Sequence, residues 1–122
     1  MPNTPLDPEL EAGLRTMPPL QASETAIKLT ATLVAGVAFL GFNLAREHPI
    51  NRAFHDMRAW MQANSDRETI SIEDLIALVE RVCFHIWTLS VFQPDPVKSQ
   101  LRELVEPICS PPQSSSADPA GR

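Results

Sequence analysis

The chain has 122 residues, a length that fits one domain, because typical domains run to about 100–150 residues. Hydrophobic residues make up 43% of the chain and charged residues 20%, which is typical of a globular protein with a buried core. Ten Lys and Arg stand against fifteen Asp and Glu, and a net charge of −5 argues against a protein that neutralises nucleic-acid phosphates. We therefore expect one acidic domain without a direct nucleic-acid partner.

An N-terminal arm, residues 1–22, is predicted to contain one short helix. The helix begins at Asp7, because Pro8 is tolerated in a first turn, where its missing N–H breaks no hydrogen bond. Pro18 and Pro19 are expected to end it. Its apolar stripe consists of Leu10, Leu14 and Met17. We expect the arm to pack at the periphery or to swing.

A long second helix is predicted from Ser23, a favourable N-cap, to about Glu47. Residues 29–45 carry no charge, which is the lower limit for a membrane span of about 20 apolar residues. Two glycines, two threonines and an asparagine interrupt the run, so a buried helix is favoured over an anchor. Membrane association through residues 29–45 is the alternative.

Three further helices follow. The third begins at Pro49, with His48 as its cap, and places Ile50 and Met57 on an amphipathic stripe. The fourth is long and begins at Ser71, because Ser followed by Glu and Asp is a capping-box variant. The fifth is short and restarts at Asp95.

Residues 110–122 are predicted to form a disordered tail, because Ser and Pro dominate them. No apolar and polar alternation long enough for a sheet is present. The predicted class is therefore all-α, a small bundle with two long antiparallel helices and three shorter ones. Its core domain spans residues 23–109.

The two cysteines, Cys83 and Cys109, are too few for a disulfide framework. Cys83 lies in an apolar helical run, where a free thiol behaves as a small hydrophobic side chain. Replacing both by Ser is therefore expected to have a modest effect on stability. The N-terminal sequence lacks a basic region followed by an apolar one, so no secretory signal is expected. These observations predict a cytoplasmic protein.

No catalytic, cofactor or metal motif is found. Only three histidines are present, and Cys83 and His85 point to divergent faces of a helix, so they do not share a zinc ion. The paired carboxylates coincide with helix starts or solvated faces, and no phosphate-binding loop occurs. We expect a non-enzymatic protein without cofactor or metal. A small helical enzyme or ligand carrier with a pocket near Trp60 and Trp87 is the last alternative.

Apolar bulk exceeds what a small bundle hides on single helix faces. The residues concerned are predicted to form a homodimer or partner interface: Phe39, Phe42, Phe84, Trp87, Val91 and Phe92. A filled monomeric core is the competing interpretation, because helices that are apolar all round also occur inside bundles.

Two segments carry a family resemblance. Met17-Pro18-Pro19-Leu20 precedes one long helix, and Thr88-Leu89-Ser90-Val91-Phe92-Gln93-Pro94 ends the other. Over about residues 18–94 the chain resembles the small helical antiactivators of bacterial quorum sensing, the TraM and QslA type. The resemblance rests on size, helix order and apolar helix ends. It implies a non-enzymatic regulator that binds a LuxR-type transcription factor and inhibits it.

Overall fold

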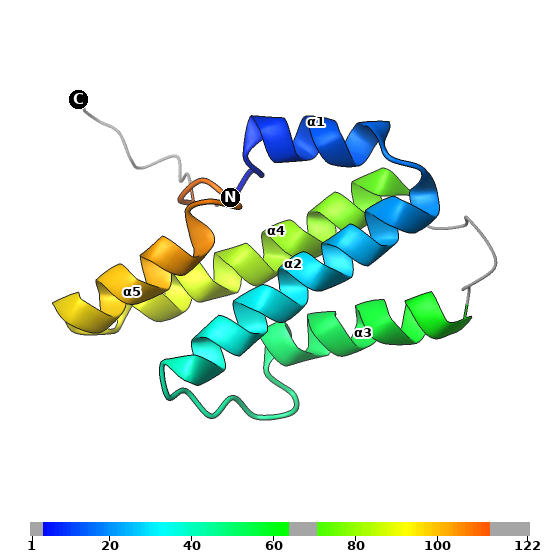
Figure 1. Cartoon of the computed structure of the whole chain (residues 1–122). Coiled ribbons are helices and arrows are strands. Elements are labelled where there is room, and N and C mark those ends of the chain that lie inside the picture. The colour runs from blue at the N-terminus through cyan, green and yellow to red at the C-terminus, as the bar shows by residue number, and fades with distance from the viewer. Residues whose placement is uncertain (1–3, 64–70, 113–122) are drawn as a thin grey trace.

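The computed structural model describes residues 4–63 and 71–112, and it confirms the all-α class (Figure 1). Its five helices are α1 (Pro8–Thr16), α2 (Pro19–Phe39), α3 (Pro49–Ala63), α4 (Ile72–Val91) and α5 (Asp95–Val105). The only extended pairing in the described ranges is an isolated antiparallel bridge between Leu6 and Cys109.

Four predicted helix starts are confirmed, and α5 begins at Asp95 as expected. The Asp7 carboxylate accepts hydrogen bonds at the start of α1. At α3, His48 Nδ1 accepts the Ile50 N–H at 3.2 Å, so the imidazole caps the helix. At α4, Ser71 Oγ accepts the Asp74 N–H at 3.1 Å, which is the predicted capping interaction.

The first turns of α2 differ from the prediction. The helix begins at Pro19 with Pro18 as its cap, and not at Ser23. The Ser23 hydroxyl instead donates to the Pro19 carbonyl at 3.0 Å and is buried. The sequence interpretation treated the two prolines only as the end of the preceding helix. A proline also fits the first position of a helix, since no hydrogen bond is lost there.

The C-terminal end of α2 lies at Phe39, eight residues before the predicted end at Glu47. Gly41 has a φ of 96°, the left-handed region that glycine adopts without a steric penalty. Its N–H donates to the Ala38 carbonyl at 2.9 Å, and the Phe42 N–H donates to the Val37 carbonyl at 3.4 Å. This pair of bonds is a Schellman motif, which ends the helix.

The two long helices run in the same direction, so the predicted antiparallel pair is wrong (Figure 1). Ala22 near the start of α2 borders the same small cavity as Ile72 and Leu75 at the start of α4. The helix α3 runs in the opposite direction, toward the end of the bundle where α2 and α4 begin, and its Met57 Sδ contacts the Thr30 hydroxyl of α2 at 3.3 Å. Two successive reversals of direction return α4 to the direction of α2.

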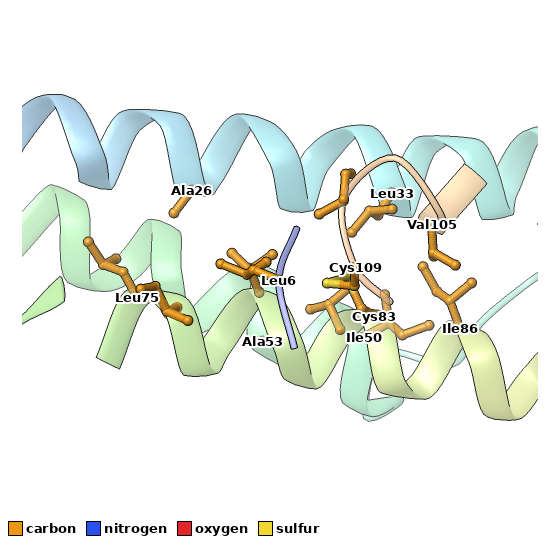
Figure 2. Close-up of a cluster of buried hydrophobic side chains, with 14 of the residues drawn as sticks. Leu6, Ala26, Leu33, Ile50, Ala53, Leu75, Cys83, Ile86, Val105 and Cys109 are labelled. Carbon is orange, nitrogen blue, oxygen red and sulfur yellow. A yellow bond between two sulfur atoms is a disulfide. The ribbon is translucent and has the colours of Figure 1, made fainter. Parts of the chain in front are cut away.

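The core lies between α2, α3, α4 and α5, and it also takes in the N-terminal segment (Figure 2). Leu6 and Leu14, which fall in the predicted arm, are 2% and 1% exposed, so this part of the arm is docked. Ser110, the first residue of the predicted tail, donates its N–H to the Pro5 carbonyl at 2.9 Å. Residues 113–122 lie outside the described ranges. The fully buried large side chains include Leu33, Val37, Ile50, Val79, Val82, Ile86, Leu101 and Val105.

Two glycines give a matched stability test. A Cβ on Gly36 of α2 would meet Leu104 Cδ1 of α5 at 2.5 Å, whereas a Cβ on Gly13 of α1 meets nothing within 4 Å. We expect Gly36→Ala to lower the free energy of unfolding by about 1 kcal/mol, since overpacking outweighs the gain in helix propensity. Gly13→Ala should raise it by about 0.5–1 kcal/mol. Urea unfolding followed by circular dichroism measures both, and effects of the same sign would contradict the close approach of α2 and α5.

Candidate functional site

A groove opens between the C-terminal half of α4 and the helix α5. Its volume is about 440 Å³. We call it the α4–α5 groove, and its lining residues are Phe84, Trp87, Thr88, Val91, Phe92, Arg102, Glu106, Pro111 and Pro112.

Four of the six predicted interface residues meet in this groove. Trp87 is only 3% exposed and belongs to the core, and Phe84 is half-buried. Val91 and Phe92 are 56% and 78% exposed, so they present apolar surface to solvent. Trp87 is therefore a core side chain that also lines the groove, whereas the two exposed residues form its outer edge.

The other two predicted residues do not line the groove. Phe39 is 89% exposed, and Phe42 is half-buried beyond the turn that ends α2. Because α2 and α4 are parallel, their C-terminal ends lie at the same end of the bundle (Figure 1). The exposed apolar surface therefore gathers at this end, but in two separate places.

Arg102 of α5 stands over the indole of Trp87 with its Cζ 5.8 Å from the ring centroid. Its Nε donates to Ser90 Oγ at 3.5 Å, and the buried Ser90 hydroxyl donates to the Trp87 carbonyl at 2.6 Å. These contacts place a cation above the face of an aromatic ring, which is an attractive cation–π arrangement. The Trp87 Nε1 has no hydrogen-bond partner among the described residues.

The outward side of α5 and the turn that follows it are acidic. Asp95, Glu103 and Glu106 are exposed, whereas Arg102 and Lys98 are half-buried. Over residues 66–106 the sequence carries eight acidic and four basic residues. The groove lining itself is balanced, with Arg102 and Glu106, so the acidic excess of residues 66–106 lies outside the groove.

The two cysteines form a disulfide, so the predicted free thiols are wrong. Cys83 of α4 bonds to Cys109 beyond α5, and both residues are fully buried. Figure 2 shows the loop that carries Cys109 lying against α4. Burial of Cys83 was expected from its apolar surroundings, but a single sequence does not reveal that the turn after α5 returns to it. The cytoplasmic location stays a prediction, now without the free thiols that supported it.

Next to the disulfide, the two end segments pair with each other. The Asp7 N–H donates to the Ile108 carbonyl at 2.9 Å, and the Ser110 N–H donates to the Pro5 carbonyl at 2.9 Å. We call residues 5–7 and 108–110 the terminal clasp. The Leu6 N–H donates to Glu80 Oε2 of α4 at 3.3 Å, so the clasp is also held to α4 by a carboxylate.

Burial raises the pKa of Glu80, and the hydrogen bond from Leu6 opposes this shift only in part. A carboxyl group whose pKa is raised by folding stabilises the folded protein when the pH lies below the pKa of the group in the unfolded chain. This stabilisation is lost as the pH rises through the pKa of the group in the folded protein. Glu80→Gln keeps an acceptor for Leu6 and removes the charge. We therefore expect this variant to melt at a higher temperature than the wild type at pH 7, and the gap to close at acid pH. Calorimetry against pH measures it, and a gap that widens in acid would contradict the assignment.

His48 and His85 are brought together, although the sequence did not predict this pair. Their ring centroids lie 6.5 Å apart in an edge-to-face arrangement. Partial burial lowers the pKa of His85, and the neighbouring His48 and Arg81 lower it further. In the described ranges no three His, Cys, Asp or Glu side chains are grouped so that they could hold a metal ion.

Searches of protein-family models, curated proteins and solved structures find no match to this chain. The site therefore has to be interpreted from its own chemistry: an apolar, partly aromatic groove with one stacked arginine.

Proposed function

We propose that the protein is a non-enzymatic regulatory protein that binds a helix of a partner protein in the α4–α5 groove. The observation that carries the proposal is the exposure of Val91 and Phe92 beside the groove. Only Leu20, Phe39, Val91 and Phe92 are exposed large apolar residues in the described ranges, so two of the four lie at one concave site. Concave apolar surface of this kind is typical of interaction sites.

The groove suits the side chains of an amphipathic helix. A volume of about 440 Å³ accommodates a few apolar anchors, and such helices present them three and four residues apart. The net charge of −5 favours a helix whose polar face is basic, because complementary charges steer association. We therefore propose a basic amphipathic helix as the occupant.

In its specific form, the proposal names a LuxR-type transcription factor as the partner, which the protein inhibits. DNA-binding proteins carry basic surfaces, so such a regulator supplies a charge that complements this acidic protein. The net charge of −5 supports binding to the regulator and not to its DNA. The resemblance to quorum-sensing antiactivators supplies the regulatory role.

The test uses an exposed residue in the groove and an exposed residue away from it. Phe92→Ser removes the proposed anchor, and Leu20→Ser at the start of α2 is the matched control, since Leu20 is also an exposed large apolar residue. The probe is a labelled basic amphipathic peptide of about 16 residues, which is four to five helical turns. Fluorescence anisotropy should show binding to the wild type and to Leu20→Ser, and binding at least about 10-fold weaker to Phe92→Ser.

An acidic version of the same peptide should bind more weakly than the basic one. If wild type and Phe92→Ser bound each peptide with the same affinity, the groove would not be the binding site. A purified LuxR-type regulator and its operator DNA test the specific form: added protein should release the regulator from DNA, and Phe92→Ser should do so less well. If the regulator stayed bound to its DNA, the antiactivator role would be contradicted. The peptide measurement alone would then decide whether the groove binds a helix.

The homodimer is a separate proposal, with Phe39 as its contact. A wild type that sediments as a dimer and a Phe39→Ser variant that sediments as a monomer would support it. A wild type that is monomeric at high concentration would contradict it.

Membrane association is the second candidate function. The helix α2 is long and apolar enough to cross a membrane, by length and composition, among the described residues. Core helices of soluble proteins meet the same criterion, and Leu33 and Val37 of α2 are fully buried. Within residues 29–45 only residues 29–39 are helical, a rise of about 16 Å against a hydrocarbon core of about 30 Å. Recovery in the membrane fraction after a carbonate wash would favour this candidate over the first.

A further inference from the structure

We infer that the Cys83–Cys109 disulfide holds one wall of the α4–α5 groove, so that thiol–disulfide exchange controls whether the groove is formed. The inference concerns the wall itself and rests on the proposed function only for what the groove binds.

Wall residues flank the disulfide on both sides in the sequence. Glu106 precedes Cys109 by three residues, and Pro111 and Pro112 follow it directly after Ser110. The helix α5 ends at Val105, so all of these residues lie beyond the last regular element of the described chain. The bond to Cys83 therefore fixes this segment against α4, whose residues form the opposite side of the groove.

Few backbone hydrogen bonds hold the segment in place. Among the described residues its backbone ties are the turn at the end of α5 and the two hydrogen bonds of the terminal clasp. Residues 5–7 of the clasp are held by the hydrogen bond from Leu6 to Glu80 at 3.3 Å, and Leu6 and Ile108 also pack in the core. The disulfide ties the segment to α4 covalently, so its loss leaves only non-covalent contacts, which can open locally.

The exchange chemistry needs a thiol donor from solution. A thiolate of a dithiol reductant attacks one sulfur of the pair, the Cys83–Cys109 bond breaks, and a mixed disulfide forms. The second thiol of the reductant then resolves the mixed disulfide. Two electrons and two protons end on Cys83 and Cys109 as two thiols, and the reductant leaves as a disulfide.

Burial sets the rate of this step. Both cysteines are 0% exposed, so an external thiol reaches them only after the clasp opens. The disulfide is therefore expected to persist in the folded protein and to exchange through this local opening.

Hydrogen exchange measured by mass spectrometry tests the wall directly. We compare the oxidised wild type with the wild type reduced by dithiothreitol and with the Cys83→Ala/Cys109→Ala variant. Exchange of the amides at residues 106–110 should accelerate on the order of 100-fold when the 26-residue separation is no longer cross-linked. The amides of α3 report global unfolding, which loss of the bond also favours, and in the reduced protein they should stay at least about 10-fold better protected than those at residues 106–110.

The basic amphipathic peptide adds a second readout, with at least about 10-fold weaker binding expected to the reduced protein. Unchanged exchange at residues 106–110 would overturn the inference. Equal protection of α3 and of residues 106–110 in the reduced protein would also overturn it, because the segment would then open only together with the whole fold. If the peptide bound neither form, while residues 106–110 of the reduced protein were less protected than α3, the proposed function would be contradicted and the role of the disulfide in the wall would be supported.

Discussion

Trp87→Ala is expected to lower the free energy of unfolding by about 3–5 kcal/mol, the cost of removing a large aromatic side chain from a core. Trp87 is 3% exposed and carries the Arg102 guanidinium over its ring. The truncation leaves a cavity between α4 and α5 and takes the ring from beneath the cation. Chemical unfolding followed by circular dichroism measures the loss, and light scattering should show an unchanged mass of the folded species.

Two control variants separate the contributions of this region. Trp87→Phe keeps a ring beneath Arg102 and removes the Nε1 donor that has no partner, so it should cost less than Trp87→Ala. Phe92→Ala is expected to change stability by no more than about 0.5 kcal/mol, since Phe92 is 78% exposed. A Phe92 variant as destabilised as Trp87→Ala would mean that the edge of the groove is part of the core.

Loss of the disulfide is the second large effect. We expect Cys83→Ala/Cys109→Ala to lower the free energy of unfolding by about 2–5 kcal/mol, because the cross-link restricts the unfolded chain over a separation of 26 residues. Two free thiols, as the sequence was interpreted, would instead give a modest effect. Thermal unfolding with and without dithiothreitol distinguishes them.

The reduced wild type and the double variant should melt at similar temperatures, well below the oxidised wild type. For a domain of about 100 residues each kcal/mol shifts the melting temperature by about 4–8 °C. A wild type whose melting temperature does not respond to complete reduction would contradict the stabilising role of the bond.

Helix starts with a side-chain cap could be predicted from the sequence, and of the two starts without one, those of α2 and α5, only the start of α5 at Asp95 was predicted. Ser71 and His48 present an acceptor to the first turn, and the structure uses both. The start of α2 has no side-chain cap, so Ser23 attracted the prediction, although it lies inside the helix. The early end of α2 could have been predicted from Gly41, because a glycine just after a helix is typical of a Schellman motif.

Helix directions were predicted less well, because they depend on how many elements lie between two partners. The third helix was recognised but not counted as a full reversal between the long ones. With α3 running back along α2, α4 has to be parallel to α2 (Figure 1).

The groove was only half visible in the sequence. The apolar bulk at the end of α4 pointed to Trp87, Val91 and Phe92. Arg102 and Pro111 reach the same place only because α5 folds back on α4 and the disulfide fixes the turn that follows. Neither residue lies in a motif, so tertiary structure alone assigns them to the site.

The pairing of Leu6 with Cys109 also sets the timing of folding during synthesis. A ribosome adds about 5–20 residues per second, so Leu6 is synthesised roughly 5–20 s before Cys109, its bridge partner. Leu6, 2% exposed in the finished fold, has no bridge partner throughout that interval. The helices of the bundle can pack as they emerge, whereas the last step joins the first residues of the described chain to nearly the last ones, and only then can the disulfide fix them.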